Sequence, residues 1–392
     1  MHIGILTFHF TYNCGAALQC LALSEYLKKC GHTVEIINYR PWYHRNVYTP
    51  FKNPFQVAKE KFRPKYEGEN PAKRLLRSLY NIPKTMISWT HHKEKSVMNK
   101  KFMGFIGENL QETRLYTTKR RLKKNPPECD IYICGSDQIW NTVLTDGKLD
   151  TAYMLDFGGE RIKRYAYAVG VNFAHDVDEE EIKKLLGRFE TVSLRENEYL
   201  DRLRNICNEG LEFRIDIDPT LLHKSEDYEK YLVEDKEEKE PFIITYVMPS
   251  PGREEVFEAA KRAGAAKGIK VIDICGNPTA FNKTAPNHKI CGPGEFLWYI
   301  KNAECIFTNS FHGTVFSVIF KKKFVCIPHP ETGYRVKELL EKISLRERIV
   351  YDAESALDTM DNEICYEDAL RMLDIYKKES EGYLKSLGKE EI

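Results

Sequence analysis

The chain alternates short apolar runs with amphipathic helical stretches, and it does so in two separate series. The first series starts with "HIGILTF" (residues 2–8), a helical stretch over residues 16–30 and "TVEIINY" (residues 33–39). The second starts with "FIITYVM" (residues 242–248) and a helical stretch over residues 254–266. Strands separated by helices of this length are typical of parallel sheets with helical crossovers. The pattern therefore predicts an α/β fold with two Rossmann-like domains facing a cleft.

A heavily charged segment separates the two series. It reads "HKSEDYEKYLVEDKEEKEP" (residues 223–241), ends in proline and fits a linker. The 392 residues also exceed what one hydrophobic core usually holds. We therefore expect an N-terminal domain over residues 1–222, a linker over 223–241 and a C-terminal domain over 242–365. Residues 366–392 are expected to form an amphipathic helix that packs back on the body.

The overall composition excludes several classes of protein. The formal net charge is +1, which gives no argument for nucleic-acid binding. The N-terminus lacks the basic and apolar regions of a signal peptide, and no apolar run approaches the roughly 20 residues that span a bilayer. We expect a cytoplasmic protein, at most attached to the inner face of the cytoplasmic membrane. The eleven cysteines show no C-x-x-C pair and no zinc spacing, so we expect buried free thiols and no metal centre.

Four loops that follow predicted strands carry polar residues, and ligands of open α/β sheets bind at such strand ends. In "FHFTYNCGAALQ", Gly15 would let the backbone approach a ligand, whereas Asn13 fits equally well as a helix N-cap. In "CGSDQIWN", Asp137 can bind a sugar hydroxyl or exchange a proton, and Trp140 can stack on a sugar ring. The alternative is that Asp137 caps a helix and Trp140 belongs to the core.

The third loop, "VSLRENEYL", places Arg195 after a buried-looking run. A guanidinium group there can grip a carboxylate or a phosphate with two parallel hydrogen bonds. The alternative is an ion pair with Glu196 or Glu198, and on this loop alone the ion pair is favoured.

The fourth loop, "TNSFHGTVFSV" (residues 308–318), lies between a predicted strand and a predicted helix. Asn309 and Ser310 offer hydrogen-bond donors, and His312 can exchange a proton near neutral pH. Alternatively, Ser310 caps the helix and His312 is a structural histidine. Because the field of a helix N-terminus disfavours an imidazolium, a charged His312 would need an anion beside it. Arg335 follows the next predicted strand and either reaches the same anion or lies on a solvated helix face.

Five segments together resemble the polysaccharide pyruvyl transferase family. They read "YNCGAALQCLALSEYLKKCGHTVEIINYRP", "DIYICGSDQIWN", "VSLRE", "DPTLL" and "AECIFTNSFHGTVFSVIFKKKFV". The resemblance implies a fold like the two-domain GT-B glycosyltransferases and phosphoenolpyruvate as the donor substrate. The acceptor would be a hexose of a capsule or exopolysaccharide, or of its precursor linked to undecaprenyl diphosphate. The product would be a pyruvate ketal, typically the 4,6-ketal of galactose or a related sugar, formed with no metal or cofactor.

The resemblance also implies roles for individual residues. His312 would act in the donor site as phosphate partner or acid, and Asp137 would activate the acceptor hydroxyl. The other expected donor contacts are Arg195 in the N-terminal domain and, in the C-terminal domain, Asn309, Ser310, Gly313 and Arg335. The expected acceptor contacts, all in the N-terminal domain, are Asn13, Cys14, Gly15, Ser136, Gln138 and Trp140. Some family members carry an arginine where this chain has Ser310, so the missing cation would come from Arg335 or from residues 321–323.

Two other functions fit the same residues. A GT-B glycosyltransferase that uses a nucleotide-sugar would need an acidic residue late in the second domain, and Glu331 and Glu338 are available. A catalytically silent glycan- or lipid-binding protein would need the aromatic and basic residues but not His312.

Residues 42–124 lie outside the resembling segments. From residue 51 to residue 101 they hold 13 Lys and Arg against 4 Asp and Glu, interleaved with aromatic residues. One interpretation is a peripheral membrane contact that receives a lipid-linked acceptor, since each basic residue near an anionic bilayer is worth about 1 kcal/mol. The other is a solvated helical excursion, and the sequence favours neither.

Overall fold

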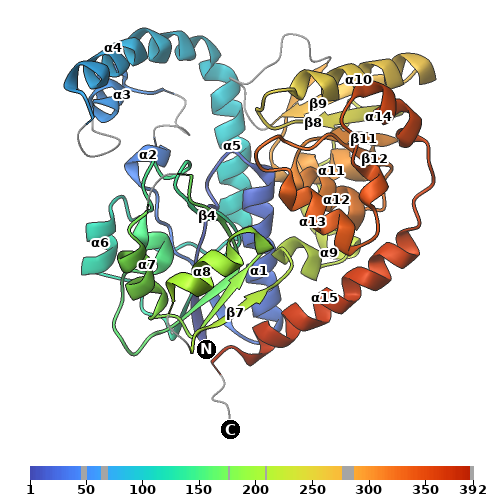
Figure 1. The fold of residues 1–392 in the computed structure, drawn as a ribbon. Coiled ribbons are helices and arrows are strands. Elements are labelled where there is room, and N and C mark those ends of the chain that lie inside the picture. Colours follow the sequence, from blue (N-terminus) through green and yellow to red (C-terminus); the bar gives the residue numbers. More distant parts are fainter. Residues whose placement is uncertain (46–50, 63–68, 175–176, 208–209, 276–286, 389–392) are drawn as a thin grey trace. The chain divides into compact units, whose positions relative to one another are not determined.

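The structure is a computed structural model that describes residues 1–45, 51–62, 69–174, 177–207, 210–275 and 287–388 (Figure 1). The contacts divide the chain into two units. Unit 1 comprises Met1–Thr11, Gln19–Pro219 and Tyr383–Ile392, and unit 2 comprises Tyr12–Leu18 and Thr220–Gly382. Each unit is built around a parallel sheet flanked by helices, which confirms the predicted fold class of two Rossmann-like α/β domains. The predicted cleft between the domains stays a prediction.

The sheet of unit 1 has the strand order β2-β1-β3-β5-β6-β7, and β4 also pairs with β5. All of these pairs are parallel. The strands are β1 (His2–Leu6), β2 (Thr33–Ile36), β3 (Ile131–Cys134), β4 (Asp137–Asn141), β5 (Lys163–Asn172), β6 (Thr191–Leu194) and β7 (Glu212–Ile215). The chain moves from β1 to β2 on one side and returns to β3 on the other, so the direction of winding switches between β1 and β3. A ligand is expected at such a switch point.

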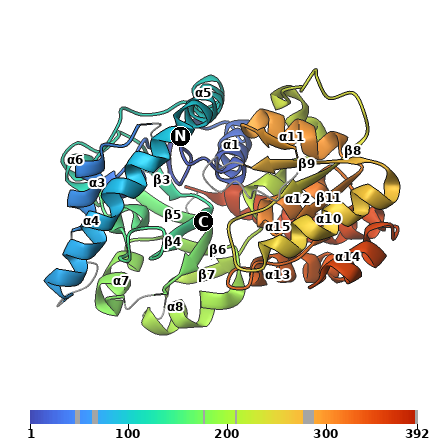
Figure 2. The ribbon, with the colours of Figure 1, turned by 90° about the horizontal axis from the view of Figure 1, so that it is seen from above.

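Helices cover both faces of this sheet. The helices outside unit 2's own series are α1 (Cys14–Lys29), α2 (Trp42–Arg45), α3 (Pro54–Lys61), α4 (Pro71–Ile87), α5 (His92–Asn109), α6 (Lys119–Lys124), α7 (Glu179–Leu186) and α8 (Leu200–Ile206), of which α3 and α4 lie away from the sheet (Figure 1). Figure 2 shows α7 and α8 on one face, where Leu186 and Leu203 join a core that contains Trp140 and Val192. The segment 42–124 is helical for most of its described length.

The sheet of unit 2 has the order β10-β9-β8-β11-β12 and is also parallel. Its strands are β8 (Phe242–Tyr246), β9 (Lys270–Cys275), β10 (His288–Ile290), β11 (Cys305–Thr308) and β12 (Phe324–Cys326). Its helices are α9 (Ser225–Tyr228), α10 (Arg253–Lys267), α11 (Pro293–Asn302), α12 (Phe311–Ile319), α13 (Tyr334–Lys342), α14 (Ala353–Met360) and α15 (Tyr366–Ser386). Here the winding switches between β8 and β11, so the carboxyl ends of these two strands form the expected ligand-binding edge of unit 2.

Alternate residues of the strands face opposite layers of helices. Ile243 and Phe307 pack with Ala260 of α10 and Ala356 of α14. On the other face the ring of Tyr246 lies 4.7 Å from that of Phe296 in α11, which in turn contacts Phe316 of α12. This packing fixes the position of α12, whose first turn carries the histidine motif.

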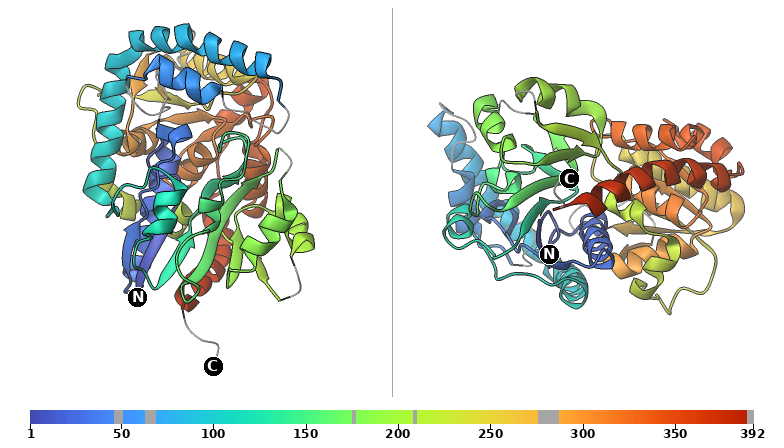
Figure 3. Two further views of the ribbon diagram at one scale, coloured as in Figure 1. Left: turned by 90° about the vertical axis from the view of Figure 1, so that its left-hand side faces the viewer. Right: turned by 90° about the horizontal axis from the view of Figure 1, so that it is seen from below.

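Residues 223–241, expected to form a linker, belong to unit 2 by their contacts. The Asp235 carboxylate accepts hydrogen bonds from the Tyr299 hydroxyl (2.5 Å) and from Lys289 Nζ (3.1 Å). The long helix α15 is the red helix of Figure 3, and its last residues belong to unit 1, where the Tyr383 hydroxyl donates to the Ala166 carbonyl (3.1 Å).

In the described part of the chain, no helix combines the length and the apolar character needed to cross a bilayer. The ten cysteines with described side chains are free, and six of them are buried, whereas Cys365 is exposed. Burial raises the pKa of Cys305 and of Cys326 to about 12, so both remain protonated thiols.

Candidate functional site

The turn from β11 to α12 is built by its own polar side chains. Ser310 is the N-cap of α12, and its hydroxyl accepts a hydrogen bond from the backbone of Gly313 (3.4 Å). The backbone N–H of Ser310 donates to Thr308 Oγ1 (3.0 Å), and that hydroxyl donates to the Tyr246 carbonyl (2.6 Å). Gly313 is needed for this packing, because a Cβ there would lie 2.4 Å from Thr308 Oγ1. The capping alternative considered for Ser310 is therefore what the structure shows.

Asn309 connects the carboxyl ends of β11 and β8, the two strands between which the winding of the unit 2 sheet switches. Its Oδ1 accepts from the backbone of Met248 (2.6 Å), and its Nδ2 donates to the Met248 carbonyl (2.9 Å) and to Ser250 Oγ (3.0 Å). The side chain is 4% exposed. These bonds give Asn309 a structural role beside β8, and its predicted contact with a donor stays a prediction.

His312 lies in the first turn of α12 and packs directly on Gly15. The ring is buried (6% exposed), and a Cβ added to Gly15 would lie 2.1 Å from its Nδ1 and 2.2 Å from its Cγ. No ordinary side chain can occupy that space. The close approach expected at Gly15 is thus an approach to a histidine of this chain, between residues 297 positions apart in the sequence.

The first turn of α1 is placed by Asn13. The Asn13 Oδ1 accepts from the backbone of Gly15 (3.0 Å) and of Ala16 (3.3 Å), which is the N-cap arrangement considered from the sequence. Cys14 is buried in the same turn. By their contacts residues 12–18 belong to unit 2. The N-terminal turns of α1 and α12 therefore meet at His312, and the dipoles of both helices favour negative charge nearby.

Two more polar side chains follow β12. The Arg335 guanidinium lies 6.0 Å from the centre of the Phe311 ring, and its Nε donates to the Thr332 carbonyl (3.2 Å). His329, which the sequence analysis did not single out, accepts from the Glu331 backbone at Nδ1 (3.1 Å). Burial is the main cause that lowers the pKa of His329, and the nearby Arg335 adds to it.

Lys321–Lys323, the other predicted source of a donor cation, lie at the opposite end of α12. The helix has nine residues, so it separates its two ends by about 13 Å at about 1.5 Å per residue. The second of these lysines is also partly withdrawn from water, and burial lowers its pKa. Of the two cation sources weighed from the sequence, the structure favours Arg335.

In unit 1 the loop after β3 is held by a buried ion-pair network. Arg195 Nε donates to Glu196 Oε1 (2.6 Å), and its Nη1 donates to Asp218 Oδ2 (2.9 Å). Ser136 Oγ donates to the same Asp218 oxygen (3.1 Å). Burial opposes the charge on Arg195, but Glu196, Asp218 and Asp137 outweigh it and raise the arginine pKa. The ion-pair alternative considered for Arg195 is observed, whereas its contact with the donor stays a prediction.

Asp137 follows Ser136 with a backbone φ of 75°, in the left-handed region that residues other than glycine seldom adopt. Its Oδ1 accepts from the backbone of Gln138 (2.8 Å). A Cβ at Gly170 would lie 3.1 Å from the Asp137 carbonyl and 3.2 Å from the Arg195 guanidinium. Strained backbone of this kind is concentrated at functional sites, which favours a role for the half-buried Asp137 carboxylate.

The structure corrects the interpretation of Trp140 as a sugar-stacking residue. Its side chain is 0% exposed, its Nε1 donates to the Tyr153 carbonyl (2.8 Å), and its ring meets Phe189 edge to face. Trp140 is a core residue because both faces of the indole are covered by other side chains of unit 1. Its neighbour Gln138 is 6% exposed and accepts from Asn141 Nδ2 (2.9 Å).

A pocket of about 250 Å³ in unit 1 offers a different aromatic side chain. It is lined by Trp42, Tyr43, Lys119, Thr145, Asp146, Lys148, Leu149 and Asp150. Asp150 Oδ2 accepts from the hydroxyls of Tyr39 (2.7 Å) and Tyr43 (2.7 Å), and Trp42 is only half-buried. Aromatic rings beside carboxylate and ammonium groups are suited to a sugar. One signal in the sequence could have indicated this pocket, the aromatic pair Trp42 and Tyr43 shortly after "TVEIINY".

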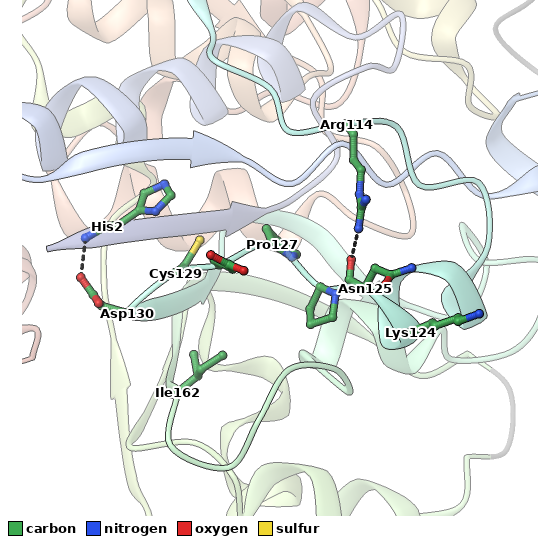
Figure 4. Close-up of a pocket in the computed structure, with 10 residues that line it drawn as sticks. His2, Arg114, Lys124, Asn125, Pro127, Cys129, Asp130 and Ile162 are labelled. Carbon is green, nitrogen blue, oxygen red and sulfur yellow. Dashed lines mark hydrogen bonds between the residues drawn. The ribbon is translucent and has the colours of Figure 1, made fainter.

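A second pocket, of about 640 Å³, lies at the amino-terminal ends of β1 and β3 (Figure 4). The backbone of His2 donates there to Asp130 Oδ2 (2.7 Å), and Arg114 donates to the Asn125 carbonyl (2.7 Å). It lies at the amino-terminal edge of the unit 1 sheet, opposite to the loops that carry Asp137 and Arg195. Among the described residues, no group of three or more His, Cys, Asp or Glu side chains could hold a metal ion.

The family model of polysaccharide pyruvyl transferases matches residues 13–332 of this chain. The chain belongs to the polysaccharide pyruvyl transferase family. The match spans both units and contains every residue predicted from the four loops except Arg335, which follows it by three positions. No curated protein sequence matches the chain.

Several solved structures are similar over the full length of this family member. The UDP-N-acetylglucosamine 2-epimerase from Rickettsia bellii is 13% identical, with 99% of this chain and 98% of that chain covered and a TM-score of 0.49. The UDP-GlcNAc 2-epimerase from Neisseria meningitidis is 11% identical, with 100% of both chains covered and a TM-score of 0.48. The spinosyn rhamnosyltransferase SpnG is 10% identical, with 99% and 100% covered and a TM-score of 0.46. These values are too low for a conclusion about function.

Proposed function

We propose that this pyruvyl transferase moves the pyruvate unit of phosphoenolpyruvate onto two hydroxyls of one hexose, with release of phosphate. The acceptor is a sugar of a surface polysaccharide or of its lipid-linked precursor, and the product is a 4,6-ketal of galactose or a related sugar. The observation that carries the proposal is the site in unit 2. There a buried histidine, His312, lies between two helix N-termini, and the Arg335 guanidinium lies 6.0 Å from the ring of its neighbour Phe311.

The donor has two anionic groups, a carboxylate and a phosphate, and the unit 2 site supplies positive potential for them. The dipoles of α1 and α12 attract anions to their N-terminal turns. Arg335 adds a full positive charge that persists at neutral pH. A bound phosphate would in turn stabilise a proton on His312. The histidine and the anionic donor therefore support each other.

The reaction balances with these groups. A proton from His312 adds to the methylene carbon of phosphoenolpyruvate and leaves an oxocarbenium ion at the neighbouring carbon. One sugar hydroxyl attacks that carbon and loses its proton to a base. The bond from carbon to the phosphate oxygen then breaks, and phosphate leaves with the proton that the base had taken. The second hydroxyl closes the ketal ring and returns its proton to His312. No step uses a metal or a nucleotide.

Asp137 is the proposed base for the acceptor hydroxyl, because its carboxylate is half-buried at the carboxyl end of β3 on strained backbone. The acceptor sugar itself is proposed to bind in the pocket beside Trp42 and Asp150. A sugar ring stacks on the indole there, and the carboxylate and the lysines of the pocket bind its hydroxyls.

The first experiment is thermal unfolding of the purified chain with phosphoenolpyruvate, with UDP, GDP and CMP as comparison ligands. A ligand at about 100 times its dissociation constant stabilises the folded state by roughly 2.7 kcal/mol, which shifts the midpoint by several degrees. We expect phosphoenolpyruvate to raise the midpoint and the three nucleotides to leave it unchanged. The His312→Ala variant should fold and lose most of this shift.

Two results would change the assignment. A shift with a nucleotide and none with phosphoenolpyruvate would identify a nucleotide-sugar glycosyltransferase. Binding of glycan with wild-type affinity by His312→Ala, together with no phosphate release by the wild-type chain, would identify a non-catalytic binding protein.

A further inference from the structure

Helix α4 presents its apolar side to the solvent. At about 100° per residue, six of its side chains fall within an arc of about 140°. These six residues, here called the α4 stripe, are Leu75, Leu76, Leu79, Tyr80, Met86 and Ile87. Each is between 49% and 68% exposed. A helix in water normally turns such a stripe towards the core, so this orientation needs a physical reason.

The opposite, polar side of α4 is the one that packs on the protein. Ser78 is 8% exposed and donates to the Ala58 carbonyl of α3 (2.7 Å). Arg77 Nε donates to the Lys61 carbonyl (2.8 Å), and Arg74 Nε donates to the Phe62 carbonyl (2.7 Å). Specific hydrogen bonds therefore fix α4 on α3 with the stripe outward.

Further apolar side chains are exposed around this helix pair. Phe51 is 62% exposed, Phe55 is 73% exposed, and Phe62, at the end of α3, is 41% exposed. Figures 1 and 3 show α3 and α4 side by side at the end of α5 that is farther from the strands of unit 1. Large apolar side chains exposed in this number on one helix pair mark a site of contact with another apolar phase.

The charged residues near the α4 stripe indicate what kind of surface it binds. Residues 51–101 hold 13 Lys and Arg against 4 Asp and Glu. Lys73 and Lys84 are exposed at the edge of the stripe, and Lys84 Nζ lies 6.0 Å from the Tyr80 ring. Burial and repulsion by three other lysines lower the pKa of Lys52 to about 8. Several lysine ammonium groups therefore lie close together in this part of the surface. A second copy of this basic surface would be repelled, whereas an anionic surface would be attracted.

We propose that this chain docks on anionic membranes through the α4 stripe, which enters the headgroup region while the surrounding lysines contact lipid phosphates. Helix α4 has 17 residues, so it is about 25 Å long at about 1.5 Å per residue and lies along the plane of the membrane. Leu and Tyr on one face with Lys and Arg beside them is the arrangement of interfacial helices. The inference rests on α3, α4 and the residues next to them in the chain, and it holds whatever reaction the chain catalyses.

The test is co-sedimentation of the full chain with vesicles of phosphatidylglycerol and phosphatidylcholine, compared with vesicles of phosphatidylcholine alone. We expect binding to the anionic vesicles that weakens with salt. The double variant Leu76→Asp/Ile87→Asp should bind at least tenfold more weakly. Its unfolding midpoint should be unchanged, because both side chains are about two-thirds exposed.

Two control variants separate the contributions. Tyr351→Asp/Ile375→Asp adds the same two negative charges at side chains that are 64% and 58% exposed and lie outside α3 and α4, and it should bind vesicles like the wild type. Lys73→Gln/Lys84→Gln should weaken binding to anionic vesicles and leave the weak binding to neutral vesicles unchanged. Absence of wild-type binding to anionic vesicles would overturn the proposal. So would equal binding by the Leu76→Asp/Ile87→Asp variant, or a concentration-dependent dimer that this variant abolishes.

Discussion

Replacing Gly15 with alanine tests the contact on which the candidate site depends. The new Cβ would lie 2.1 Å from His312 Nδ1, whereas carbon atoms in ordinary contact approach to about 3.5 Å. The ring must therefore move by more than about 1 Å, or the first turn of α1 must shift by as much. A displacement of about 1 Å in a catalytic group can cost about 100-fold in rate. We expect kcat/KM for phosphoenolpyruvate-dependent phosphate release to fall by about two orders of magnitude.

The stability of the same variant gives an independent readout. Overpacking a buried site costs about 1–3 kcal/mol, and alanine regains up to about 1 kcal/mol over glycine in a helix. We expect a net loss of about 1–2 kcal/mol by chemical denaturation. Gly104→Ala is the matched control, because this helical glycine has no heavy atom within 4 Å of the added Cβ. It should leave activity unchanged and stability equal or slightly higher.

A double-mutant cycle tests whether the His312 ring causes the loss of stability in the Gly15→Ala variant. In the His312→Ala background the imidazole is absent, so Gly15→Ala should cost no stability and bring a small gain. If Gly15→Ala destabilises both backgrounds equally, the two residues do not interact and the geometry of the site is wrong. If the single variant keeps activity within threefold of wild type, the position of His312 does not limit the reaction.

Three further substitutions probe other parts of the molecule. Trp42→Ala should raise the KM for the sugar acceptor about tenfold or more and leave the KM for phosphoenolpyruvate unchanged, and an equal change in both would exclude a sugar-specific role. Arg195→Leu should lower the free energy of unfolding by roughly 3–5 kcal/mol in denaturant titrations, because it removes the cation that neutralises the buried carboxylates of Glu196 and Asp218, whereas a loss below about 1 kcal/mol would contradict that network. Burial lowers the pKa of His44 to about 4. The contribution of the neutral His44 ring to the free energy of unfolding is therefore fully present above about pH 6.5 and is lost as the pH falls towards 4. His44→Phe should make denaturant midpoints less dependent on pH in this window, and an unchanged dependence would assign the loss to other groups.

The sequence predicted the sheets well because the apolar runs and the helical faces are local patterns. "HIGILTF", "TVEIINY" and "FIITYVM" all contain strands of the parallel sheets, and the turn at Ser310 begins a helix as the sequence indicated. Trp140 was misinterpreted for a local reason. In "CGSDQIWN" every residue except Asp137 is buried, and the many polar residues of this segment indicated a loop although β4 extends the sheet. The sequence also did not predict that the apolar face of α4 is exposed, because an amphipathic pattern does not show which face of a helix packs on the protein.

The allocation of residues to the two substrates stays a prediction, and it did not anticipate which of these residues contact one another. Asn13, Cys14 and Gly15 were assigned to the acceptor because they lie in the first series of strands, yet Gly15 contacts His312. In this structure the glycine is explained by the ring that covers it, and a ligand is not needed to account for it. The same argument applies to the donor roles of Asn309 and Ser310, whose polar atoms are engaged by neighbouring backbone. Under the proposed function, recognition of the donor depends on His312 and Arg335. Recognition of the acceptor is proposed for unit 1, in the pocket beside Trp42.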